Sequence, residues 1–96
     1  MNKSENYLNN LGLARKANVL LSGDTLFKNL AKVKLLILAT DASQKTKERV
    51  LKKAHFYNLP VVEKHSSRDL SRATALSNRM VLGVTDTNFA KMLNID

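Results

Sequence analysis

The sequence predicts an α/β fold, a three-layer α/β/α sandwich around a small four-stranded sheet of mixed strand direction. Helix-like and strand-like segments alternate along the 96 residues, which is typical of strands joined by helical crossovers. The run Leu35–Leu38 is apolar without alternation, as expected of a strand covered on both faces. One Pro, three Gly and no low-complexity stretch leave no candidate linker, so residues 1–96 are expected to form a single domain.

Two helices and two strands are predicted in the first part of the chain. Ser4 suits the N-cap of the first helix, and Asn18 can end it because Asn tolerates the left-handed conformation. Gly23 turns the chain between the first strand and the second helix. In order, the predicted elements are a helix over residues 4–17, a strand over 19–21, a helix over 24–32 and a strand over 33–40.

Three helices and two strands are predicted in the remainder. Ser43 lies where the third helix opens, and Pro60 closes it because the residue before a proline is pushed out of the helical region. In order, the predicted elements are a helix over residues 44–57, a strand over 61–63, a helix over 68–76, a strand over 80–84 and a helix that begins at Asp86 or Thr87 and continues through Leu93.

The third predicted helix has two different faces. Its inward stripe, read from helical spacing, consists of Val50, Leu51, Ala54 and Tyr57. Its opposite face, which is usually just solvated, carries Lys45, Glu48, Arg49, Lys52 and Lys53. Phe56 lies on that polar face, where it could stack on a nucleic-acid base, although packing beneath a neighbouring loop is the favoured interpretation.

Composition and charge narrow the class of function. The absence of Cys excludes disulfides, thiolate chemistry and Cys-rich zinc modules. No apolar run could span a bilayer and the first ten residues are polar, so we expect a cytoplasmic protein with no membrane partner. Sixteen Lys and Arg against eight Asp and Glu give a net charge of +8, mostly in the first two thirds of the chain. This excess favours nucleic acid as partner over the alternative that it only aids solubility.

The junction before the second helix is the most informative local motif. The first amides of a helix lack internal partners and carry partial positive charge, so they attract phosphate. Gly23 would let a nucleic-acid backbone approach, and Lys28 lies one turn further along. The structural alternative is a capped helix with solvated lysines. Arg15 and Lys16 suit the C-terminus of the first helix and can add to a basic rim.

Catalytic motifs are missing from the sequence. His55 and His65 have no carboxylates spaced to share a metal with them, and no Gly-rich nucleotide-binding motif is present. Asp41 and Asp86 follow predicted strands, where α/β enzymes often carry catalytic groups, but both are better explained as helix caps. We expect no catalysis, cofactor or metal. A small nuclease or phosphotransfer enzyme using His65 or Asp41 is the less favoured alternative.

An ordered set of short segments covers nearly the whole chain. The segments are LGLARKA at 11–17, LSG at 21–23, Lys28, LATDAS at 38–43, YNLPV at 57–61, LSRA at 70–73, VTD at 84–86 and FAK at 89–91. The set resembles the YlxQ-type bacterial proteins of the L-seven-Ae/L-thirty-e ribosomal protein superfamily. This resemblance implies an L-thirty-e-like sandwich and a non-catalytic, ribosomal-protein-like RNA-binding protein.

The resemblance also implies where RNA binds. Members of the superfamily typically place two elements against kink-turn or related bent RNA, the junction after the first strand and a loop after the fourth helix. The first element corresponds here to Ser22, Gly23, Asp24, Thr25 and Lys28, with Thr40 and Asp41 ending the neighbouring strand. The second corresponds to Ala75, Leu76, Ser77, Asn78 and Arg79. We expect Lys28, Lys32 and Arg79 to neutralise phosphates and residues 76–78 to recognise RNA shape.

The chain departs from the archaeal kink-turn binders at two positions after the glycine. Those proteins carry Asn-Glu, whereas this chain has Asp24 and Thr25. Asp24 cannot donate as Asn does, and Thr25 lacks a carboxylate that accepts from guanine N–H groups. The resemblance therefore supports binding of structured RNA more directly than kink-turn specificity.

The expected partner is structured RNA, with ribosomal RNA and other non-coding RNAs as candidates, and the free protein is expected to be a monomer. The first alternative is a protein-interaction module, which would place the basic face against an acidic partner in the translation or transcription machinery.

Overall fold

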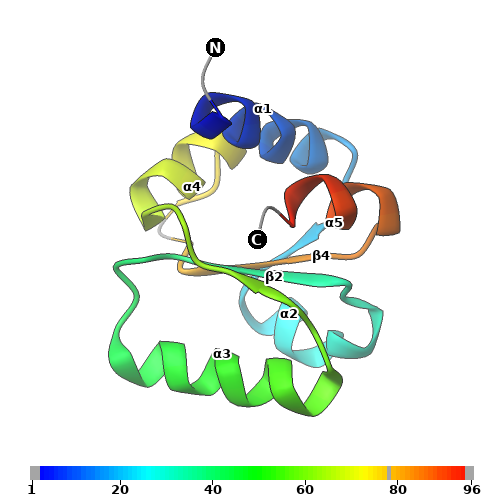
Figure 1. Ribbon diagram of the computed structural model, residues 1–96, viewed down its shortest axis with the longest axis vertical. Coiled ribbons are helices and arrows are strands. Elements are labelled where there is room, and N and C mark those ends of the chain that lie inside the picture. The colour runs from blue at the N-terminus through cyan, green and yellow to red at the C-terminus, as the bar shows by residue number, and fades with distance from the viewer. Residues whose placement is uncertain (1–2, 78, 95–96) are drawn as a thin grey trace.

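The computed structural model describes residues 3–77 and 79–94, which form four strands and five α-helices in three layers. Helices α1, α4 and α5 cover one face of the sheet, and α2 and α3 cover the other (Figure 1). The predicted sandwich is therefore confirmed. In chain order the elements are α1 (Lys3–Lys16), β1 (Leu20–Leu21), α2 (Gly23–Lys28), a 3₁₀ turn η1 (Leu30–Lys32), β2 (Leu35–Leu38), α3 (Gln44–Tyr57), β3 (Val61–Val62), α4 (Ser67–Thr74), β4 (Val81–Val84) and α5 (Thr87–Leu93).

The sheet has the strand order β1-β4-β2-β3. Strand β4 pairs antiparallel with both β1 and β2, and β2 pairs parallel with β3. As a result, β1, β2 and β3 all end at one edge of the sheet, which is the edge where β4 begins. We call this edge the strand-end surface, formed by residues 22–25, 40–41, 75–77 and 79. It contains residues 22–25 and most of the second loop to which the resemblance assigned RNA binding; Asn78 lies outside the described residues.

The core occupies both faces of the two central strands. Every residue of β2 and β4 is buried, which confirms the interpretation of the non-alternating run Leu35–Leu38. Gly83 in β4 lets α2 pack directly on the sheet, because a Cβ there would overlap Leu26 Cδ1 and lie 3.1 Å from Val33 Cγ2. This close packing of Leu26 on Gly83 fixes the position of α2, whose first residue is Gly23.

Helix α2 is shorter than predicted. It ends at Lys28, where Asn29 leaves the helical conformation and its Nδ2 donates to the Thr25 carbonyl at 2.8 Å. Lys32 belongs to the separate turn η1, which leads into the start of β2 at the opposite edge of the sheet from the strand-end surface. The prediction that one helix extends over residues 24–32 and includes Lys32 is therefore wrong.

Helix α3 has the predicted bounds but a narrower buried face. The Ser43 hydroxyl accepts from the Thr46 N–H at 3.1 Å, which caps the helix, and Asn58 ends it in the left-handed conformation. Leu51 is 50% exposed and Tyr57 39% exposed, so neither belongs to the buried stripe. Among the described helices, none is long and apolar enough to cross a membrane.

Candidate nucleic-acid interface

The turn between β1 and α2 exposes its backbone. Gly23 has φ of +60°, a conformation that side-chain-bearing residues rarely adopt. The preceding residue, Ser22, is extended and its hydroxyl forms no capping hydrogen bond, so the N-cap side chain does not cover the first amides of α2. Helix α2 has only six residues, so its dipole adds little, and attraction of an anion to this turn must come from neighbouring side chains.

Arg79 supplies such a side chain and brings the two predicted RNA-binding elements together. A Cβ built on Gly23 would lie 3.9 Å from Arg79 Nη1, so the guanidinium lies beside the bare backbone of the turn. The backbone N–H of Arg79 donates to Ser71 Oγ on α4 at 3.2 Å, which fixes the start of the side chain. Arg79 Nε is buried and has no hydrogen-bond partner among the described residues. A half-buried guanidinium beside an exposed backbone turn favours an anion such as a phosphate.

A hollow of about 250 Å³ lies next to Ser22 and Leu76. It is lined by residues from α1, β1, α2 and the loop after α4. The loop is held by Thr74, whose Oγ1 donates to the Leu70 carbonyl at 2.8 Å and accepts from the Leu76 N–H at 3.4 Å. Ala75 then adopts the left-handed conformation with φ of 60°. Half-buried Leu76 is thereby presented to the junction. The lining residues are Arg15, Asn18, Leu20, Leu21, Ser22, Thr25 and Leu76.

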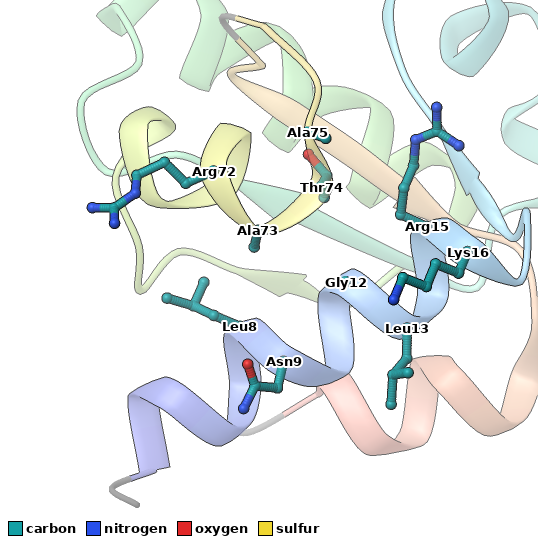
Figure 2. Close-up of a pocket in the computed structure, with 10 residues that line it drawn as sticks. All are labelled: Leu8, Asn9, Gly12, Leu13, Arg15, Lys16, Arg72, Ala73, Thr74 and Ala75. Atoms are coloured by element: carbon teal, nitrogen blue, oxygen red, sulfur yellow. The ribbon is translucent and has the colours of Figure 1, made fainter.

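Three further arginines lie around this surface. Arg15 reaches the hollow at the junction, and Arg68 and Arg72 border a second hollow with Leu76 and Ser77. Figure 2 shows the groove between α1 and α4, with Arg72 towards one end and Arg15 towards the other. Sequence reasoning gave Arg15 only a place on a basic rim and gave Arg68 and Arg72 no role. Arg68 and Arg72 are four residues apart on the helix before the loop, a spacing that places both on one helix face, and this was the available sequence signal.

Asp41 has a structural role at the strand-end surface. Its carboxylate accepts from the Ser67 N–H at 2.7 Å and from the Ser67 hydroxyl at 2.6 Å. The hydrogen bond from the Ser67 hydroxyl is the main reason why the pKa of Asp41 lies below its ordinary value. The neighbouring Thr40 N–H donates to the His65 carbonyl at 2.9 Å. These contacts join the end of β2 to the start of α4.

The other residues that the sequence analysis singled out lie at different places in the structure. Lys28 is exposed at the end of α2, and Asp24 is exposed in its first turn. Lys32 lies at the other edge of the sheet and is not part of the strand-end surface. His65 is buried, with its ring centroid 4.9 Å from that of Tyr7, which gives the nuclease alternative no support. Within the described part of the chain, no group of three or more His, Asp or Glu is arranged to hold a metal.

Known proteins resemble this chain in sequence and in structure. It is 37% identical to a Bacillus subtilis protein named RNA-binding protein YlxQ. This alignment spans 86 residues and covers 86% of each chain. The chain is 34% identical to an Enterococcus faecium protein of the same name. This alignment spans 88 residues and covers 88% of this chain and 84% of the relative. No protein-family model matches the chain.

Two solved structures share the fold. A protein of unknown function from Bacillus halodurans superposes with a TM-score of 0.85 at 37% identity, covering 91% of both chains. A 15.5kD RNA-binding protein from Giardia lamblia superposes with a TM-score of 0.74 at 20% identity, covering 97% of this chain and 86% of the other. The fold implied by the sequence resemblance is confirmed by these likenesses. Because identity of 34–37% extends over most of both sequences, the chain belongs to the YlxQ family.

Proposed function

We propose that this protein is a non-catalytic RNA-binding protein that binds structured RNA at the strand-end surface. The observation that carries the proposal is the half-buried Arg79 guanidinium, whose Nη1 lies beside the exposed backbone of Gly23. The names of the two bacterial relatives and the net charge of +8 support RNA as the partner.

The side chains in and around the strand-end surface can bind different parts of a bent RNA, namely its phosphates and its unstacked bases. Arg79 and Arg15 offer guanidinium groups that bind phosphate oxygens in pairs, and Lys28 adds a point charge on α2. Leu76 offers an apolar side chain to a base that is turned out of its stack. Sequence-specific RNA recognition uses such unstacked bases, whereas duplex DNA keeps them paired, so RNA is the favoured nucleic acid.

Kink-turn RNA is one candidate target within this proposal. Asp24 and Thr25 replace the Asn-Glu pair of the archaeal kink-turn binders, so specificity must come from the shape of the bend and from Leu76. We infer that the protein prefers bent RNA to continuous duplex, with a weaker dependence on the identity of the guanines at the bend.

The experiment is a titration of three RNAs at salt concentrations from about 50 to 200 mM. The RNAs are a kink-turn, the same kink-turn with its guanines replaced, and a continuous duplex of equal length. We expect both bent RNAs to bind more tightly than the duplex. Lys28→Ala should weaken binding and lower the salt slope by about 1, as for the loss of one phosphate contact.

Lys32→Ala is the matched control, because it removes the same charge from the opposite edge of the sheet. It should leave affinity for the bent RNAs close to that of the wild type. Equal affinity for all three RNAs, or equal effects of the two lysine substitutions, would refute the site. Pull-down of a protein partner that persists after nuclease treatment, with no RNA binding, would favour the protein-interaction alternative.

A further inference from the structure

The outer side of α3 carries a row of cations and one aromatic ring. Helix α3 is the outermost element of the layer opposite α1, α4 and α5 (Figure 1). Five exposed residues at spacings of i, i+4, i+7, i+8 and i+11 share its solvent side. We call them the α3 ridge: Lys45, Arg49, Lys52, Lys53 and Phe56. Phe56 is 79% exposed, so the expectation that it packs beneath a neighbouring loop is wrong.

The ridge cations are not neutralised by carboxylates of the described structure. The ion pair on this helix joins Lys47 to Glu63 at 2.9 Å, at the flank next to β3, and does not involve the ridge. Glu48 is the one acidic residue of α3, and it accepts a hydrogen bond from Gln44 at 3.4 Å. The positive charge of the ridge is therefore available to a partner.

Two ring contacts shape the ridge. The guanidinium carbon of Arg49 lies 3.8 Å from the centroid of the Phe27 ring, a cation–π contact that orients Arg49. Because Phe27 precedes Lys28, this contact also brings the ridge next to a residue of the proposed RNA site. At the far end, the rings of Phe56 and Tyr57 meet edge to face with centroids 5.1 Å apart, which restricts the Phe56 ring while leaving it exposed.

This chemistry fits a nucleic acid better than a protein. Protein interfaces have apolar centres and are depleted of Lys, whereas the ridge is mostly cationic and has one apolar side chain. Surfaces that bind single-stranded RNA combine cations along the backbone path with aromatic rings on which bases stack. The distance along the helix from Lys45 to Phe56 is about 16 Å, which is enough to contact several successive nucleotides.

We propose that the α3 ridge binds a single-stranded RNA segment that flanks the structured element at the strand-end surface. This proposal rests on the proposed function. Lys45, Lys52 and Lys53 bind the phosphates, and one base stacks on the Phe56 ring. Arg49 continues the positive surface towards Lys28, so one RNA molecule can occupy both surfaces.

Tryptophan fluorescence tests the stacking contact, because the chain contains no Trp. Phe56→Trp places a single fluorophore on the ridge, and Leu51→Trp places one at another exposed apolar position of the same helix. An oligouridine of about 12 nucleotides should quench the Phe56→Trp signal and leave the Leu51→Trp signal unchanged. Absence of quenching at position 56, or equal quenching at both positions, would overturn the proposal. So would equal quenching by poly-glutamate at the same charge concentration, which would favour an acidic protein as partner.

Affinity measurements separate the two surfaces. A kink-turn RNA is compared with the same RNA extended by the oligouridine. We expect Phe56→Ala to weaken binding of the extended RNA about fivefold and to leave the compact RNA unaffected. The Lys52→Ala, Lys53→Ala double variant should lower the salt slope for the extended RNA by about 1.4, since each single-strand phosphate contact contributes about 0.7. Lys91→Ala on α5, on the other side of the sheet, is the control for a lost positive charge.

The two proposals fail in different ways. If Phe56-dependent binding of oligouridine is observed without binding of the compact RNA, the ridge is supported and the strand-end site is refuted. If the compact RNA binds through Arg79 and the extension adds no affinity, the ridge is refuted and the strand-end site is retained.

Discussion

Asp41 and Arg79 are two charged residues at the same edge of the sheet, yet their surroundings differ. The Asp41 carboxylate accepts two hydrogen bonds from Ser67, at 2.7 and 2.6 Å. The Arg79 guanidinium lies beside a bare glycine turn, and its buried Nε has no partner within the described residues. In sequence, both are charged residues at a strand boundary in loops assigned to RNA binding. Hydrogen-bond satisfaction thus separates Asp41, which joins two elements of the fold, from Arg79, which we propose binds RNA.

The largest difference is expected for Arg79→Ala. We expect a loss of at least about tenfold in affinity for bent RNA, because a charge-assisted hydrogen bond contributes about 1.5–3 kcal/mol. Thermal stability should change little, since Arg79 Nε has no hydrogen-bond partner among the described residues to lose. RNA titration and a melting curve on the same preparation measure both effects. Arg79→Lys should recover part of the affinity, because it keeps the charge without the paired donors. A large drop in melting temperature would assign Arg79 to the scaffold instead.

The next effect in size concerns the turn that Arg79 approaches. Gly23→Ala should destabilise the protein by about 1–2 kcal/mol, because alanine is strained at φ of +60°. The added Cβ would lie at an ordinary contact distance of 3.9 Å from Arg79 Nη1, so the cost is backbone strain and not a clash. Urea unfolding measures it. Unchanged stability would mean that residue 23 adopts another conformation in solution.

A smaller and opposite pattern is expected for Asp41. Asp41→Asn should lower the melting temperature, because the amide replaces the carboxylate that Ser67 binds. RNA affinity of the folded protein should stay near that of the wild type. Ser67→Ala is the matched variant, since it removes the hydroxyl partner and leaves the charge. A strong loss of RNA affinity with unchanged stability in either variant would move Asp41 from the scaffold to the interface.

The smallest effect concerns pH. Hydrogen bonds from Ser67 hold the pKa of Asp41 below its ordinary value of 3.8 in the folded protein. The stability they provide is therefore complete above that value and is lost as pH falls through the lower, folded-state pKa. The difference in unfolding free energy between wild type and Asp41→Asn should shrink on acidification below 3.8. Urea unfolding over a pH series measures it, and a difference that stays constant would contradict the role of Ser67.

Local signals predicted much of the fold. The apolar run Leu35–Leu38 indicated the central strand, and Ser43 and Pro60 indicated the two ends of α3. The errors occurred where one side chain competes with the backbone or where a common residue adopts a rare conformation. Asn29 ends α2 through its own hydrogen bond to Thr25, and Ala75 takes the left-handed conformation usually left to glycine. Neither event has a distinct signal in the sequence.

The site was less predictable than the fold, for a different reason. The two loops could be assigned from the resemblance, but the approach of Arg79 to Gly23 depends on how β4 and β1 pair in three dimensions. The antiparallel pairing of β4 with β2 and the end of α2 at Lys28 place Lys32 at the other edge of the sheet. Side chains that differ little in sequence therefore differ in position once the sheet is formed.

Nuclear magnetic resonance of the labelled protein during addition of a bent RNA measures where the RNA lies. The signals to follow are the backbone amides of Gly23 and Leu76 and the side-chain Nε–H of Arg79. If RNA occupies the strand-end surface, these signals shift first and most, while the amides of Lys32 and Lys34 at the opposite edge stay in place. Shifts concentrated at Lys32 and Lys34, with Arg79 Nε–H unchanged, would contradict the proposed interface.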